Sequence, residues 1–269
     1  MQRVAVITGA SRGIGRAVAL GLARVGWAVA VAAKSEASTE KLPGSVHSVA
    51  AEIEALGAPA LAVPLDVRDE GQVAAMAEAV HKRFGRCDLL VNNAGALWWK
   101  PILETPAKRF DLVMGVNARG AFLCCQALLP LLRASGRAHI VNMSPPLDLD
   151  LVPGRIAYAI SKLGMTLLTH GLAQEERAHG VGVVSLWPAT IIESQASINH
   201  GLGTPEMWRK PDILVDCIRR IVEKEPAAQA GRARIDEDFL REEGVADLSG
   251  YACVPGTTPP RLSVRMMTR

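Results

Sequence analysis

The cysteines of this 269-residue chain lack the number and spacing that a disulfide framework or a structural zinc site requires. They are odd in number, and no two of them have C-x-x-C spacing or histidine partners at metal-ligand spacing. The five are Cys87, Cys124, Cys125, Cys217 and Cys253. We therefore expect free thiols, no bound metal and a reducing, cytoplasmic environment.

The sequence also lacks any concentration of charge. Thirty Lys and Arg residues face 27 Asp and Glu residues, and the excess of +3 is spread along the chain without a basic run or stripe. Proteins that bind nucleic acid usually carry such a stripe, so we expect no nucleic-acid partner.

Long apolar runs are missing as well. The residues after Met1 show no signal-peptide pattern, and no apolar run reaches the roughly 20 residues that span a bilayer. The sequence therefore predicts no membrane insertion.

What the sequence does contain is an alternation of short apolar runs with amphipathic stretches. The apolar runs, which are candidate strands, cover residues 4–7, 28–32, 60–63, 89–91, 139–141 and 181–186. The candidate helices between them cover residues 14–25, 46–56, 73–84, 118–132 and 157–179. This order predicts an α/β fold of the Rossmann type, a doubly wound parallel sheet with helices on both faces, as a single domain over residues 1–269.

The periodicity lapses between residues 194 and 210. Gly201, Gly203 and Pro205 favour a loop, and the Met207-Trp208 pair supplies one hydrophobic anchor. Two interpretations are open, a lid over a substrate or an ordinary surface connection whose Trp208 faces the core.

A glycine-rich turn follows the first predicted strand and leads into a helix. Its candidate cofactor-binding residues are Gly9, Ser11, Arg12, Gly13, Ile14 and Gly15. Backbone without Cβ atoms can approach a pyrophosphate at a helix N-terminus, which is how dinucleotide-binding folds hold their cofactor. The spacing differs from G-x-G-x-x-G, so a methyltransferase or a simple tight bend stays open at this point.

The second predicted strand lacks the acidic residue that an NAD site normally has at its end. It ends in Ala33-Lys34-Ser35, so Lys34 and Arg12 are placed to flank a 2′-phosphate, and we expect NADP with NAD possible. The alternative is that Lys34 is an ordinary solvated surface residue, and Glu36 nearby weakens the electrostatic argument.

Two further segments follow the third and fourth predicted strands. Asp66, with Val67 beside it, is a candidate acceptor for the adenine amino group, although an isolated Asp is more often a cap or turn residue. Asn93, Ala94 and Gly95 are small enough for backbone to lie against the nicotinamide side of a cofactor.

Tyr158 and Lys162 lie four residues apart on a predicted helix and therefore share one face. An adjacent Lys and an oxidised nicotinamide would favour the phenolate, lower the pKa of the Tyr and allow it to exchange an alcohol proton. Surface patterning is the alternative for such a pair. Asn117, near a predicted helix start, is either a cap or a residue that holds a water leading away from Lys162.

The order of these motifs resembles the short-chain dehydrogenase/reductase family over roughly residues 3 to 192. The resemblance implies that Tyr158 is the acid and base of the reaction, that Lys162 also binds the nicotinamide ribose and that Asn117 supports a proton relay. It implies further that Pro188 to Ile191 contact the nicotinamide carboxamide, with Ala189 where the family commonly has Gly. A homodimer or homotetramer is the assembly that the family suggests.

One position departs from the family pattern. The catalytic Ser usually lies thirteen residues before the Tyr, where this chain has Pro145, with Ser144 one residue earlier. Either Ser144 substitutes as a catalytic residue, or it only ends its strand, because Pro cannot donate to a sheet ladder. Segments 144–147, 187–190 and 235–237 resemble more narrowly a subgroup of the family that lacks the same serine.

These observations predict an NADP(H)-dependent oxidoreductase that acts on the carbonyl or secondary alcohol of an apolar small molecule. The alternative, from another functional class, is a catalytically weak NADP-binding or sensing protein, because Pro145 replaces the usual Ser. A Rossmann-type methyltransferase is a third hypothesis, and it would not need the Tyr158 and Lys162 pair.

Overall fold

The computed structural model describes residues 1–40, 42–145 and 149–262. Within these residues, seven parallel strands form one sheet in the order β3-β2-β1-β4-β5-β6-β9. They are β1 (Val4–Thr8), β2 (Ala28–Ala33), β3 (Ala60–Pro64), β4 (Leu89–Asn92), β5 (Ala138–Met143), β6 (Val181–Trp187) and β9 (Ala233–Ile235). The strands β1, β2, β4, β5 and β6 are buried along their whole length, as expected for a sheet covered on both faces.

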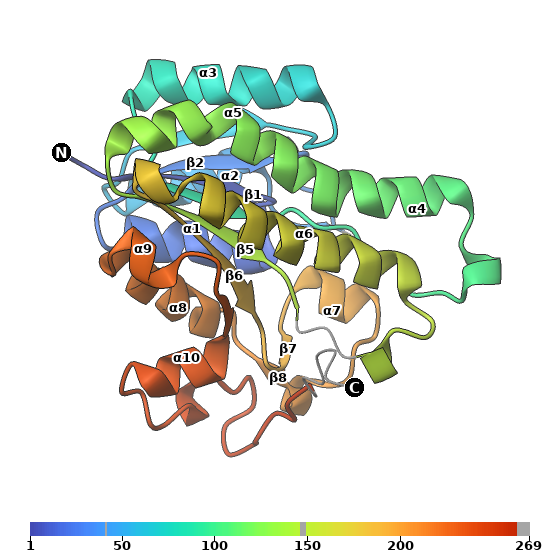
Figure 1. Cartoon of the computed structure of the whole chain (residues 1–269). Helices are drawn as coiled ribbons and strands as arrows, with labels where there is room; N and C mark the ends of the chain where they lie inside the picture. The colour runs from blue at the N-terminus through green and yellow to red at the C-terminus, as the bar shows by residue number, and fades with distance from the viewer. Residues whose placement is uncertain (41, 146–148, 263–269) are drawn as a thin grey trace.

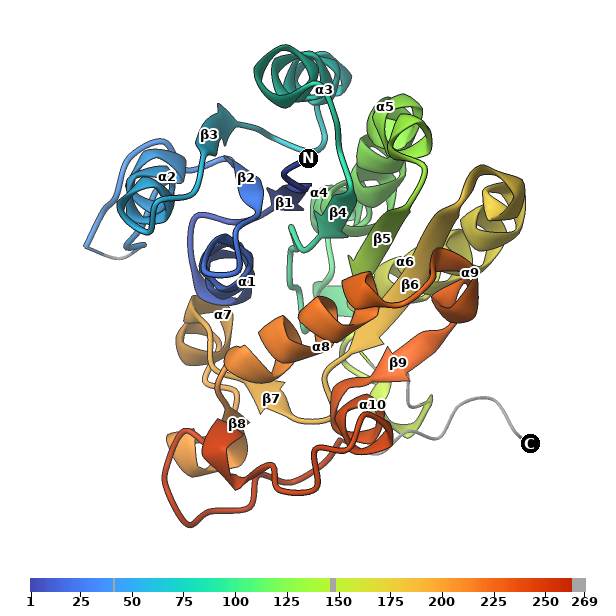
Figure 2. The same ribbon diagram turned by 90° about the vertical axis from the view of Figure 1, so that its left-hand side faces the viewer.

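Helices cover both faces of this sheet (Figures 1 and 2). One face is covered by α1 (Gly13–Ala23), α2 (Val46–Ala55), α8 (Asp212–Glu223) and α10 (Asp236–Glu242). The other is covered by α3 (Glu70–Phe84), α5 (Gly120–Ser135) and α6 (Ile156–Glu175). Three shorter helices complete the described part, namely α4 (Ala107–Met114), α7 (Gln195–Asn199) and α9 (Pro226–Gln229). The doubly wound parallel fold predicted from the sequence is confirmed.

The direction of winding reverses between β1 and β4. From β1 the chain moves outward to β2 and β3, and it then crosses to β4 on the other side of β1 and continues to β5, β6 and β9. A sheet of this kind opens a crevice at the carboxyl ends of the two strands where the order reverses. The turn after β1 and the turn after β4 therefore meet at one edge.

All six predicted strands are present, with bounds that differ by at most two residues. The sequence pattern did not reveal β9, the helices after residue 194, or a small second sheet of β7 (Ile191–Ile192) and β8 (Trp208–Arg209). The helix α8 has a clear amphipathic pattern, with Ile213, Ile218 and Ile221 buried, so the signal for it was present.

The sequence predicts no apolar stretch long enough to span a bilayer. This expectation is wrong, because one helix has the length and the apolar composition of a membrane span. Residues 107–135 run through α4, a π-helical segment (Gly115–Arg119) and α5 as one apolar helix that meets both criteria. Within the described residues, 44% of the apolar 18-residue stretch of this helix is buried inside the protein. Core helices of soluble proteins meet the same criteria.

Candidate active site

A pocket of about 950 Å³ opens at the carboxyl edge of the sheet. Its walls come from the turns after β1 to β6, from the N-terminal half of α6 and from residues 194–203. Of the predicted site residues it collects Gly9, Ser11, Arg12, Gly13, Ile14, Lys34, Asp66, Val67, Asn93, Ala94, Gly95, Ser144, Tyr158, Lys162, Pro188 and Ile191. The predicted residues outside its walls are Gly15 and Asn117, which lie directly behind them.

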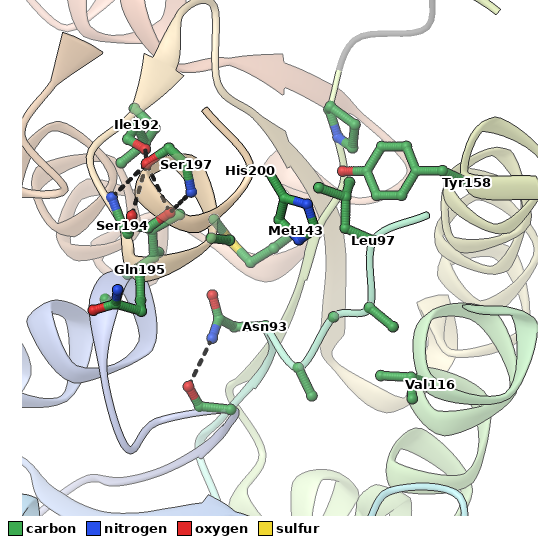
Figure 3. Close-up of a pocket in the computed structure, with 18 of the residues that line it drawn as sticks. Asn93, Leu97, Val116, Met143, Tyr158, Ile192, Ser194, Gln195, Ser197 and His200 are labelled. Carbon is green, nitrogen blue, oxygen red and sulfur yellow. Dashed lines mark hydrogen bonds between the residues drawn. The ribbon is translucent and has the colours of Figure 1, made fainter. Parts of the chain in front are cut away.

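The glycine-rich turn is held against the end of β4 by short-range contacts. The hydroxyl of Thr8 accepts hydrogen bonds from the backbone N–H groups of Asn93 and Ala94, at 3.1 and 3.0 Å. The amide of Asn93 in turn donates to the carbonyl oxygens of Thr8 and Gly9 (Figure 3). Gly9 has φ +67°, and a Cβ there would lie 2.8 Å from the Cα of Ala94. This glycine-rich turn, residues 9–15, is called the glycine cradle below. It needs glycine at position 9 for its positive φ and for the close approach of its backbone to the segment after β4.

Replacing Gly15 by Ala is expected to weaken NADPH binding by about tenfold or more, roughly 1.4 kcal/mol. A Cβ at Gly15 would lie 2.5 Å from the carbonyl oxygen of Gly9, so the backbone of the cradle has to move. Fluorescence titration with NADPH measures this loss. Gly171→Ala is the control, since its Cβ would meet nothing within 4 Å, and the helix should gain up to about 1 kcal/mol of stability. Equal NADPH affinities in the two variants would contradict the proposal that the glycine-rich turn binds the cofactor.

Positive charge gathers at the end of β2. The guanidinium of Arg12 donates to the hydroxyl of Ser35 at 3.0 Å and to the carbonyl oxygen of Gly44 at 2.9 Å, and so joins the start of α1 to the segment after β2. Lys34 is largely exposed and lies 3.3 Å from Asp66. Arg68, which the sequence pattern did not single out, lines the same wall.

Asp66 lines the pocket as predicted, but Arg68 already engages its carboxylate. The Nε and Nη2 atoms of Arg68 donate to it at 3.0 and 2.6 Å, and this guanidinium holds the pKa of Asp66 well below its usual range. The carboxylate thus stays ionised and oriented at this wall. Its predicted bond to adenine stays a prediction.

Asn117 lies inside the π-helical segment and is fully buried. Its amide oxygen accepts the N–H of Ala96 at 2.7 Å, and its nitrogen donates to the carbonyl of Ala96 and to the hydroxyl of Ser161. The cap interpretation is therefore wrong, because the side chain fixes the segment after Gly95 instead of its own helix end. The proton relay through a water stays a prediction.

Lys162 is 6% exposed, and burial lowers its pKa to about 8. Its Nζ donates to the carbonyl oxygen of Met143, the last residue of β5, at 2.8 Å and lies 5.8 Å from the centre of the Tyr158 ring. The hydrogen bond to this backbone carbonyl holds the ammonium of Lys162 beside the phenol of Tyr158, at the carboxyl ends of the strands. Tyr158 and Lys162 therefore both line the pocket, and the interpretation of the pair as surface patterning is wrong.

Tyr158 points into the pocket (Figure 3). It packs edge-to-face against Trp99, with ring centres 6.1 Å apart. In this structure burial raises its pKa, which is opposite to the lowering expected from Lys162. The positive charge of Arg155, one helical turn before Tyr158, acts in the opposite direction to burial and favours a lower pKa. Neither Arg155 nor Trp99 was among the residues predicted from the sequence.

Ser144 lines the pocket at the end of β5 and bonds to α6. Its hydroxyl donates to the backbone carbonyl of Lys162 at 3.0 Å and contacts the hydroxyl of Thr166 at 3.3 Å. In this geometry its proton is directed at α6, and the catalytic role considered for Ser144 stays a prediction. Pro145 itself lines the pocket, while Pro146 and Leu147 lie outside the described residues.

The segment after β6 contributes a buried polar group that suits a cofactor. The hydroxyl of Thr190 lines the pocket and has no hydrogen-bond partner among the described residues, a state that is rare for a buried polar atom and favours a ligand there. The carboxylate of Asp236, the first residue of α10, accepts a hydrogen bond from the backbone N–H of Ala189 at 2.8 Å and so fixes the segment after β6. The residues of the pocket thus fit a dinucleotide.

Residues 194–210 contribute both to the pocket wall and to the buried part of the protein, and the lid role of this segment stays a prediction. Residues 194–203 line the pocket through α7 and the turn after it, as a substrate lid would. Trp208 is buried and its indole N–H donates to the carbonyl of Leu202, so the segment is also anchored to the core.

Comparison with known proteins decides the family. The model of the short chain dehydrogenase family matches residues 3–200, well over half of the chain. This protein is a short-chain dehydrogenase. It is therefore an oxidoreductase by family, and solved structures of related members support a nicotinamide cofactor.

Hydroxysteroid dehydrogenase-like protein 2 of Xenopus tropicalis is 44% identical over 253 residues, which are 93% of this short-chain dehydrogenase and 60% of the relative. The chain thus spans between about half and three fifths of the length of the curated relatives that it matches. This likeness confirms the narrower resemblance seen in segments 144–147, 187–190 and 235–237.

Two solved structures agree with the fold. A crystal structure of a Xanthomonas campestris protein assigned as a dehydrogenase is 42% identical, with a TM-score of 0.92, and covers 97% of this chain and 96% of its own. A metagenomic short-chain oxidoreductase in complex with NADP is 31% identical, with a TM-score of 0.72, and covers 87% and 96%.

Proposed function

We propose that this short-chain dehydrogenase transfers hydride between NADP(H) and the carbonyl or secondary alcohol carbon of a largely apolar small molecule. The observation that carries the proposal is the position of Tyr158 and Lys162 in the same pocket as the glycine cradle. A methyltransferase needs the cradle but not this pair, so the methyltransferase hypothesis is dropped.

The side chains supply the proton side of this reaction. When bound, a nicotinamide cofactor supplies or accepts the hydride. The phenol of Tyr158 gives its proton to the carbonyl oxygen on reduction and takes it from the alcohol on oxidation. The ammonium of Lys162, fixed on Met143, stabilises the phenolate that forms when Tyr158 donates.

The preference for NADP rests on the cations at the end of β2. Lys34→Ala is expected to weaken NADPH binding about fivefold to tenfold and to leave NADH binding unchanged, because one charge-assisted contact to a 2′-phosphate is lost. Parallel titrations with the two cofactors measure the ratio. Lys100→Ala is the matched control, because Lys100 is also exposed and paired with a carboxylate, at 3.4 Å, but lies outside the pocket walls. An equal loss for NADH and NADPH would contradict a 2′-phosphate site.

The other end of the pocket supports an apolar substrate. The pocket that contains Tyr158 is also lined by Leu97, Leu112, Val116, Val152 and Leu202. Burial of such walls favours a substrate with a hydrocarbon body.

The test of the proposed function is NADPH oxidation with a panel of aldehydes, cyclic and aromatic ketones and steroid-like ketones, repeated with NADH. Turnover with NADPH on apolar ketones, lost in Tyr158→Phe, is the expected result. Tight NADPH binding without turnover on any compound would contradict it.

That second outcome corresponds to a catalytically weak NADP-binding or sensing protein. The observation that favours this candidate is the hydroxyl of Ser144, which is turned to α6 and leaves the carbonyl without the usual Ser donor.

A further inference from the structure

Cations outnumber carboxylates at the substrate end of the pocket. Among the described residues that line the whole pocket, the one carboxylate is Asp66, and it lies at the opposite end, where Arg68 and Lys34 neutralise it. Around Tyr158 the charged walls are Lys162 and Arg155, and His200 reaches into the same space from the lid side (Figure 3). This end is therefore electropositive.

Arg155 is held in place without an ionic partner. It is half-buried, and its guanidinium carbon stacks 4.4 Å above the centre of the Trp99 ring. No carboxylate in the described part of the chain lies within ion-pair distance of it. Stacking of this kind orients the guanidinium plane and leaves its N–H donors free at the edge.

The chain offers an internal comparison for this arrangement. Arg109 stacks on the neighbouring Trp98 at 4.6 Å, but Arg109 is exposed, and neither residue lines the pocket. Of these two Arg–Trp stacks, the one whose Trp packs against Tyr158 has both of its residues among the pocket walls.

The proposal that follows rests on the proposed function and narrows its substrate class. We propose that Arg155 is a substrate-binding residue and that the substrate is an oxo acid or hydroxy acid with an apolar body, whose carboxylate pairs with the guanidinium.

Three features support a carboxylate in particular. A guanidinium presents a planar fork that matches a carboxylate with two hydrogen bonds. A doubly charged phosphate would need a second cation to offset its desolvation, and the other cation at this end, the ammonium of Lys162, is held on Met143 beside the phenol of Tyr158. The apolar side chains among the pocket walls, such as Leu97, Val116 and Val152, offer a dianion no polar groups that would replace its water.

Binding is tested first, on the NADP-loaded protein and without turnover. Calorimetric titration compares 4-phenylbutanoate with 4-phenylbutanamide, which share shape and differ in charge. The wild-type protein should bind the acid at least about tenfold more tightly, a difference of roughly 1.4 kcal/mol. Arg155→Gln should reduce that preference to less than about twofold, and Arg109→Gln should retain it. Equal affinities in the wild type, or a preserved preference in Arg155→Gln, would overturn the proposal.

Turnover separates this inference from the function on which it rests. NADPH oxidation is measured with 4-phenyl-2-oxobutanoate and with its ethyl ester. The acid should be favoured in kcat/KM, mainly through KM, and Arg155→Gln should remove the preference while it still reduces the ester. If neither these two compounds nor any ketone or aldehyde of the panel is turned over but the binding preference persists, the proposed function fails and the carboxylate site stands. If the ester is the better substrate in the wild type and in Arg155→Gln alike, the carboxylate site fails and the proposed function stands.

Discussion

Tyr158→Phe is expected to lower the rate of hydride transfer by about a thousandfold or more and to leave NADPH binding nearly unchanged. The substitution removes the one atom that can exchange the proton. The ring stays and keeps its edge-to-face contact with Trp99, so the pocket should not collapse. Single-turnover oxidation of bound NADPH with a ketone substrate measures the chemical step apart from binding.

The chain contains one other tyrosine, which makes a matched control. The hydroxyl of Tyr251 donates to Asp216 at 2.6 Å, and Tyr251 lies outside the pocket walls. Tyr251→Phe should lower stability by about 1 kcal/mol through the lost hydrogen bond and leave the rate unchanged. A Tyr158→Phe protein that retains a tenth or more of the wild-type rate would rule out Tyr158 as the proton donor.

Glu237→Gln is expected to lower the free energy of unfolding by about 3–5 kcal/mol. Arg209 donates to Glu237 at 2.7 Å, and both side chains are almost completely buried. Removing the carboxylate leaves an arginine charge in the core that cannot give up its proton. Because Arg209 belongs to β8, which pairs with β7 directly after the Pro188–Ile191 segment, loss of the pair should also loosen the substrate end of the pocket.

The reverse substitution should cost less. In Arg209→Met, the carboxylate of Glu237 still has Arg241 and Arg261 within 3.5 and 3.7 Å. Chemical denaturation of both variants measures the difference, with Glu223→Gln as a control. Glu223 pairs with Arg3 on the surface, where such pairs contribute less than about 1 kcal/mol. Equal losses for Glu237→Gln and Glu223→Gln would show that the buried pair has no special role.

Much of the site could be predicted because it is built at strand ends. The residues after β1, β3, β4 and β6 must meet at one edge once the sheet is parallel, so the order of the strands along the chain is enough to assign Gly9, Asp66, Asn93 and Pro188 to one site. The direction of the Ser144 hydroxyl could not be assigned in this way. It depends on how closely α6 packs on β5, and the sequence only shows that a proline follows.

The charges around Tyr158 were predicted less well. The helical spacing correctly paired Tyr158 with Lys162, but the expected lowering of the Tyr pKa did not account for burial, which acts in the opposite direction here. Arg155 also lies one turn from Tyr158, yet nothing in its sequence context separates it from a solvated helix-end residue. Its role depends on Trp99, which reaches it from the segment after β4.

The sequence by itself determined the alternation of strands and helices, the parallel sheet, the glycine cradle and the spacing of Tyr158 and Lys162. These are properties of neighbouring residues, because backbone conformation and side-chain periodicity act over a few positions. Only the tertiary structure decided that Ser144 faces α6, that Asp66 is held by Arg68 and that Arg155 stacks on Trp99 beside the phenol. Each of these depends on the direction of a side chain after packing, which brings together groups whose positions in the sequence are not related by any local period.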